Sequence, residues 1–99
     1  MGEIVPLRRT EDREPLWREL VGDQLRRTRL EREERLVDVA QRAGVSPQYL
    51  SEVERGLKDP SSEMLAAVAG ALDLTARELS VRAAGAATRT AGPALCLAA

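Results

Sequence analysis

The chain has 99 residues, 15 basic and 16 acidic side chains, and a formal net charge of −1 at pH 7, a size that suits one domain with a modest core. Aromatic residues make up 2% of the chain, which favours a core of Leu, Val, Ala and Met in small helices over a β-sandwich. The sequence shows no apolar run long enough to span a bilayer and no signal peptide, so we expect no membrane contacts. Cys96 is the one cysteine, so no internal disulfide can form, and we expect a cytoplasmic protein.

Five segments with apolar residues at helical spacing predict an all-α domain over residues 15–82. Residues 1–14 have no sustained period, and we expect a flexible N-terminal arm. In chain order, the expected helices cover residues 15–32, 36–43, 47–55, the segment from a cap at Ser61 to Leu72, and, after a cap at Thr75, residues 76–82. Residues 83–99 are rich in Ala, Gly and Thr and have little bulk to bury, so we expect a disordered tail.

The junction between the second and third expected helices is the most informative stretch. Gly44 can take a left-handed backbone and end the second helix. Ser46 can cap the third helix, whose first residue, Pro47, needs no amide donor, and Gly56 can end it. A short helix after a tight glycine turn is what a helix-turn-helix needs to place a recognition helix in the major groove of DNA.

The third expected helix has an apolar face and a polar face. The apolar residues Val45, Leu50 and Val53 fall together and are expected to pack inward. On the polar side, Gln48 can form two hydrogen bonds with adenine, and Glu52 can accept one from the cytosine amino group. The alternative is a merely solvated helix face, which the glycine turn, the cap and the trailing glycine together disfavour.

The segments Gly44-Val45-Ser46, Leu50-Ser51, Val53-Glu54-Arg55-Gly56 and Pro60-Ser61 resemble the Cro/phage-repressor (Xre-like) helix-turn-helix family over roughly residues 16–81. The run from Tyr49 to Gly56, followed by Ser61-Ser62-Glu63, is similar to the actinobacterial regulators of Clp protease genes. The resemblance implies a five-helix domain that binds double-stranded DNA and regulates transcription. We expect no cofactor and no metal.

Carried over by position, the resemblance implies three sets of site residues. The base-reading positions are Pro47, Gln48, Ser51 and Glu52, and the phosphate-contacting positions are Arg35, Ser46, Arg55 and Lys58. The recognition helix would be supported by Gly44 and by a salt bridge between Arg29 and Glu54. Pro47 departs from the family pattern because it offers no donor, although its ring can touch a thymine methyl group.

The resemblance also implies a biological role, as an activator of clp and related proteolysis genes that contacts RNA polymerase and is itself degraded by the Clp protease. Leu97, Ala98 and Ala99 match a degradation tag of such regulators, although an Ala-rich tail would end in the same way. Two recognition helices must enter successive major grooves about 34 Å apart. We therefore expect a homodimer on an inverted repeat, joined through the fifth helix, its neighbours or the N-terminal arm.

The acidic balance of the chain is counter-evidence for a DNA-binding protein, and it weighs less if only the DNA-facing surface is positive. The rival hypotheses are a phage-type repressor or antitoxin-like DNA-binding protein on the same fold, and an interaction module that binds no DNA. An enzyme is disfavoured, because the chain has no His, no base beside Cys96, no metal-ligand cluster and no phosphate-binding glycine loop.

Overall fold

The structure is a computed structural model, and it describes residues 15–90. This range contains five helices and no strand: α2 (Trp17–Glu31), α3 (Leu36–Ala43), α4 (Pro47–Glu54), α5 (Ser62–Ala71) and α6 (Ala76–Thr90). The expected all-α architecture of five helices is therefore confirmed. The predictions for the N-terminal arm, for Cys96 and for the tag at Leu97, Ala98 and Ala99 fall outside the described residues.

Local sequence signals account for the helix starts. The hydroxyl oxygens of Ser46 and Ser61 each accept a backbone N–H three residues ahead, at 3.0 and 3.2 Å. Thr75 and Glu78 cap α6 reciprocally, because each side chain accepts the backbone N–H of the other residue, at 3.0 and 2.8 Å. By contrast, α3 starts after Arg35, which offers no side-chain cap.

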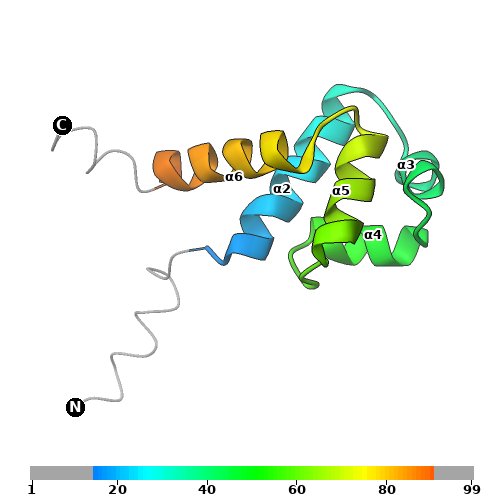
Figure 1. The fold of residues 1–99 in the computed structure, drawn as a ribbon, viewed down its shortest axis with the longest axis horizontal. Helices are drawn as coiled ribbons and strands as arrows, with labels where there is room; N and C mark the ends of the chain where they lie inside the picture. The colour runs from blue at the N-terminus through cyan, green and yellow to red at the C-terminus, as the bar shows by residue number, and fades with distance from the viewer. Residues whose placement is uncertain (1–14, 91–99) are drawn as a thin grey trace, which may run out of the picture.

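The core lies between the helices and consists of aliphatic side chains. Helix α2 packs against α4 and α6, while α3 packs against α4 and α5, and α5 packs against α6 (Figure 1). The buried hydrophobic residues are Val21, Leu25, Val39, Ala40, Leu50, Val53, Val68, Ala69, Leu72, Leu79 and Ala83. Burying each Val or Leu contributes about 1.5–3 kcal/mol, and this packing holds together helices that are too short to be stable alone.

Helix α6 is longer than predicted, so the expectation of a disordered tail from residue 83 is wrong as far as residue 90. The helix continues to Thr90, and Ala83 is fully buried. Alanine is the strongest helix former and lets helices approach closely, and α6 packs along α2. The small side chains of this segment therefore allow close packing of α6 on α2, and they do not indicate disorder. The other helix ends differ from the prediction by no more than two residues, which is within the usual fraying of helix ends.

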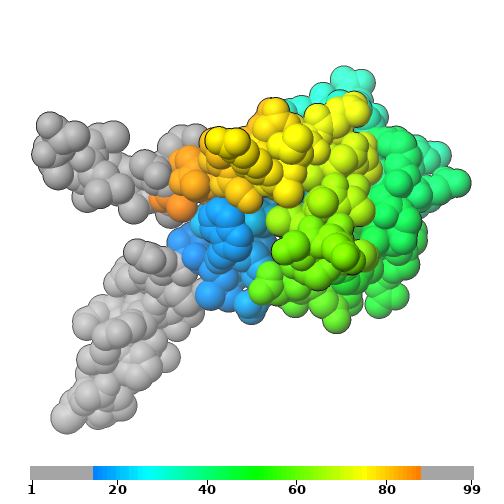
Figure 2. Space-filling view, viewed as in Figure 1, coloured from blue at the N-terminus to red at the C-terminus, as the bar shows by residue number. Residues whose placement is uncertain are grey.

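The described part of the molecule has two distinct ends. Helix α3 and the start of α4 form one end, the far part of α6 forms the opposite end, and the start of α2 lies beside the turn after α4 (Figures 1 and 2). The two ends can therefore make different contacts without competing for the same surface. None of the helices described between residues 15 and 90 is long and apolar enough to cross a membrane.

Candidate nucleic-acid interface

The turn between α3 and α4 has the predicted geometry. Gly44 has a φ of 77°, and a side chain there would meet no atom within 4 Å, so glycine is needed for its conformation and not for space. The Gly44 amide donates to Gln41 O at 3.2 Å, and the Val45 amide donates to Ala40 O at 3.0 Å. These bonds satisfy the last carbonyls of α3 and turn the chain directly into α4.

Helix α4 presents one face to the core and the other to solvent. Leu50 and Val53 are buried, as the spacing predicts. Pro47 and Gln48 are exposed, whereas Ser51 and Glu52 are half-buried. Within residues 15–90, none of the side chains at these four base-reading positions has a hydrogen-bond or ion-pair partner. Three polar side chains are thus available to bases, and their role as readers stays a prediction.

The predicted pair between Arg29 and Glu54 is confirmed, and it is bidentate. Arg29 Nε donates to Glu54 Oε2 at 2.8 Å, and Arg29 Nη2 donates to Glu54 Oε1 at 3.0 Å. The two side chains are only 12% and 5% exposed. The hydrogen bond with Glu54 raises the pKa of Arg29, against the opposing effect of burial. The pair ties the last residue of α4 to α2.

The four predicted phosphate-contacting residues differ in their present partners. Arg55 and Lys58 are exposed and, in the described part of the chain, have no ion-pair partner. Arg35 is paired with Asp38 at 3.1 Å, but its side chain is 80% exposed, and an ion pair this exposed is weak enough for a phosphate to replace Asp38. The Ser46 oxygen serves as the helix cap, which leaves its O–H free to donate.

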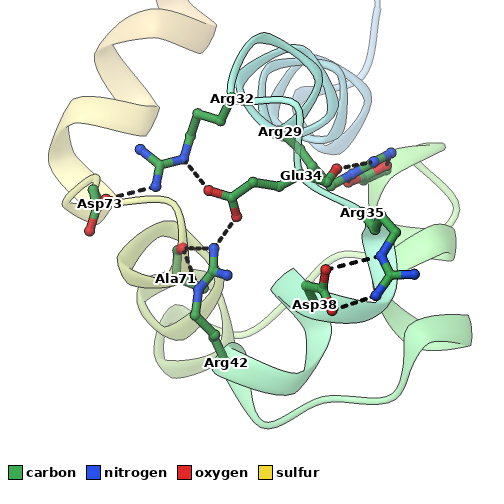
Figure 3. A network of polar contacts seen from close by, with 9 residues as sticks. Arg29, Arg32, Glu34, Arg35, Asp38, Arg42, Ala71 and Asp73 are labelled. Atoms are coloured by element: carbon green, nitrogen blue, oxygen red, sulfur yellow. Dashed lines mark hydrogen bonds and ion pairs between the residues drawn. The ribbon is translucent and has the colours of Figure 1, made fainter.

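The sequence did not reveal a network centred on Glu34, which lies between α2 and α3 (Figure 3). The Glu34 carboxylate pairs with Arg32 at 2.8 Å and also with Arg42. Arg32 continues to Asp73 at 2.8 Å, and Arg42 donates to the carbonyl of Ala71 at 2.7 Å. The network joins the end of α2, α3 and the turn between α5 and α6.

Ion pairing in this network changes two protonation equilibria. The hydrogen bond from Arg42, together with that from Arg32, lowers the pKa of the Glu34 carboxyl below its ordinary 4.5. The hydrogen bond to Glu34 is also the largest cause of the raised pKa of Arg32. The only sequence signal for this network is the charge-rich run over residues 31–35.

Two further unpredicted contacts hold the end of α4 against α2. Arg18 Nε donates to the carbonyl of Gly56 at 3.0 Å, and Gly22 lies directly against the carbonyl oxygens of Val53 and Glu54. Neither residue belongs to a motif, and both contacts join segments that are distant in the sequence. A glycine inside an otherwise regular helical pattern is the one signal that could have indicated close packing at Gly22.

A helix-turn-helix family model matches residues 25–79, which is more than half of the chain. The chain therefore belongs to the helix-turn-helix family of Cro/C1 type. Similar proteins include the transcriptional regulator ClgR of Mycobacterium tuberculosis (strain H37Rv), which is 52% identical over 59 residues, 60% of this chain and 53% of the relative. The chain thus spans about half the length of the curated relatives it matches.

Solved structures agree with this assignment. The clp gene regulator ClgR from Corynebacterium glutamicum has a TM-score of 0.76 and 40% identity, covering 85% of this chain and 89% of that one. The restriction-modification controller protein C.AhdI from Aeromonas hydrophila has a TM-score of 0.60 and 31% identity, covering 63% of this chain and 94% of that one. The chain is a homologue of ClgR transcriptional regulators, which form a non-enzyme family.

Proposed function

We propose that this protein is a sequence-specific DNA-binding transcriptional regulator that places α4 in the major groove. The observation that carries the proposal is the outer surface of α4, where Gln48 is exposed and, like Ser51 and Glu52, has no partner within the described residues. The turn at Gly44 and the ion pair between Arg29 and Glu54 hold this helix in place. Arg55 and Lys58, which have no ion-pair partner among residues 15–90, lie where the chain leaves this helix.

The distribution of charge, and not the net charge of −1, bears on whether α4 can approach DNA. Asp23, Asp38 and Asp73 each pair with an arginine, as do Glu34 and Glu54. These five carboxylates engage five arginines, so pairing leaves the net charge unchanged and holds these acids away from free contact with DNA. The two cations that follow α4, Arg55 and Lys58, pair with no carboxylate of the described part of the chain and can neutralise DNA phosphates, which is the contribution that governs affinity and its dependence on salt.

The test measures fluorescence anisotropy of a labelled duplex carrying the DNA upstream of the protein's own gene, at several salt concentrations. We expect affinity to fall as salt rises, and Lys58→Gln to reduce the slope of log affinity against log salt by about 1 per protomer. Arg77→Gln on α6, which removes the same charge elsewhere, is the matched control. Absence of binding, or binding that salt does not change, would contradict the proposal and favour an interaction module.

We further propose a homodimer on an inverted repeat, joined through α6 and the neighbouring start of α2. Trp17 at the start of α2 and Val81 on α6 are 47% and 64% exposed, and exposed large apolar side chains favour contact with a partner. Sedimentation of Trp17→Ser and Val81→Ser should reveal weaker self-association, whereas Val37→Ser on α3 should not. A monomer at operator-binding concentrations would refute the dimer.

The proposed biological role is activation of clp and related proteolysis genes through RNA polymerase, with degradation by the Clp protease. The homology to ClgR supports the target genes, and Leu97-Ala98-Ala99 supports the degradation step. Acting on chromosomal DNA, the protein would work in the cytoplasm. Replacing Ala98 and Ala99 by Asp should lengthen its half-life in cells that contain the protease, and an unchanged half-life would exclude the tag.

The alternative function is a phage-type repressor or an antitoxin-like DNA-binding protein on the same fold. The similarity to a restriction-modification controller keeps this alternative open for the regulatory role. A reporter behind the bound promoter separates the two, because an activator raises transcription and a repressor lowers it.

A further inference from the structure

The first turn of α2 packs against Gly56, where the chain leaves α4. Arg18 Nε donates to the main-chain carbonyl of Gly56 at 3.0 Å, a partly buried contact between residues 38 positions apart. Gly56 has a φ of 78°, and a Cβ placed on it would lie 2.8 Å from Glu19 Cγ. The turn after α4 therefore fits tightly against two side chains in the first turn of α2.

A second contact lies one turn further along α2. A Cβ at Gly22 would lie 2.2 Å from Val53 O and 2.8 Å from Glu54 O. Only glycine lets the backbone of α2 come this close to the last carbonyls of α4. Together with the ion pair between Arg29 and Glu54, this packing fixes the C-terminal end of α4 along much of the length of α2.

The contacts between α2 and Gly56 lie beside two of the proposed phosphate-contacting residues. Arg55 directly precedes Gly56, and Lys58 follows it by two positions. Helix α4 has only eight residues, too few to hold a defined shape without its neighbours. The direction in which the chain leaves α4, and with it the position of both cations, depends on what holds Gly56.

We propose that Arg18 is a positioning residue for DNA binding, whose hydrogen bond to the Gly56 carbonyl holds Arg55 and Lys58 against the DNA backbone. This inference rests on the proposed function. Arg18 acts through its hydrogen bond to the main chain at Gly56. DNA binding therefore depends on the N–H at Arg18 Nε and not on the positive charge of the side chain.

The chemistry of Arg18 allows a matched pair of variants. In Arg18→Gln, the amide nitrogen stands as many bonds from the backbone as Arg Nε does, so it can still donate to Gly56 O. In Arg18→Met, a methyl group takes that place and donates nothing. Both variants lose the charge. Arg26→Gln removes a charge from an exposed position on the same helix and serves as the control.

The probe is a duplex selected from a random pool by the unmodified full-length protein, and each variant is measured for affinity, salt slope and thermal midpoint. We expect Arg18→Met to bind about five- to tenfold more weakly, with a salt slope reduced by about 1 per protomer. Arg18→Gln should recover most of both losses, and Arg26→Gln should match the unmodified protein.

Four outcomes would overturn the inference. Equal weakening by Arg18→Gln and Arg18→Met would indicate a direct charge contact with phosphate. Unchanged binding by both would remove Arg18 from the interface. If the loss of affinity in each variant is proportional to the fall in its thermal midpoint, and the salt slope is unchanged, Arg18 only stabilises the fold. If the unmodified protein enriches no duplex, the proposed function fails first, and the positioning role fails with it.

Discussion

The ion pair between Arg29 and Glu54 makes a quantitative prediction about the stability of the recognition helix. The pair is bidentate, and its side chains are 12% and 5% exposed. Glu54→Leu would leave the Arg29 guanidinium without its carboxylate in a mostly buried site, at a cost of about 3–5 kcal/mol. That is a large share of the roughly 5–10 kcal/mol that stabilises a domain of this size. It should lower the thermal midpoint by at least about 12 °C.

The double variant Arg29→Met with Glu54→Leu tests the physical reason for this loss. Because it removes both charges, it should be more stable than Glu54→Leu alone. Recovery should be partial, since Arg29 Nη1 also donates to the carbonyl of Glu34 at 3.0 Å. The measurement is urea unfolding followed by circular dichroism. The exposed pair of Arg27 and Asp23 is the control, and breaking it should cost less than about 1 kcal/mol.

The reasoning would be refuted if Glu54→Leu cost no more than the exposed control pair. It would also be refuted if the effects of the two single variants simply added in the double variant. Either result would mean that the two side chains are not coupled, and that packing alone holds the end of α4 against α2.

Three further predictions concern the support of the site. Gly44→Ala should destabilise the protein by about 1–2 kcal/mol in urea unfolding, because the φ of 77° is unfavourable for any residue with a Cβ; no change would mean that the turn relaxes. Leu50→Ala should cost about 2–5 kcal/mol, because Leu50 is fully buried, and a cost below that of an exposed Leu57→Ala control would contradict the packing. Pairing lowers the pKa of Glu34 below 4.5, so its contribution to stability is present above that pH and is lost as pH falls through the lowered folded-state pKa. The stability difference between the unmodified protein and Glu34→Gln should therefore shrink as pH falls below 4.5, and a difference that did not change on acidification, or that vanished above that pH, would refute this assignment.

The parts of the fold that the sequence predicted are those set by local interactions. Gly44 must take a positive φ to end α3, Ser46 lies one residue before α4 and accepts a nearby amide, and Leu50 and Val53 repeat at helical spacing. Each of these signals spans a few residues, and the structure confirms each one. The pair between Arg29 and Glu54 was predicted from the family resemblance, since no local rule joins residues 25 positions apart.

The parts that the sequence did not predict depend on distant segments or on small residues. Ala83 was assigned to a disordered tail because alanine offers little area to bury, yet this small size suits the contact between α6 and α2. Arg18 and Glu34 gain their roles only after folding brings Gly56 and Arg42 beside them. Side-chain spacing along one helix carries no information about such partners.

The central claim is that the outer surface of α4 reads DNA sequence, and selection of duplexes from a random pool tests it most directly. The unmodified protein should enrich an inverted repeat with half-sites about 34 Å apart. The variant with Gln48→Ala and Glu52→Ala should keep salt-dependent binding but lose preference at one or more base positions in each half-site. Failure to enrich any sequence, or enrichment of the same sequence by both proteins, would contradict the claim.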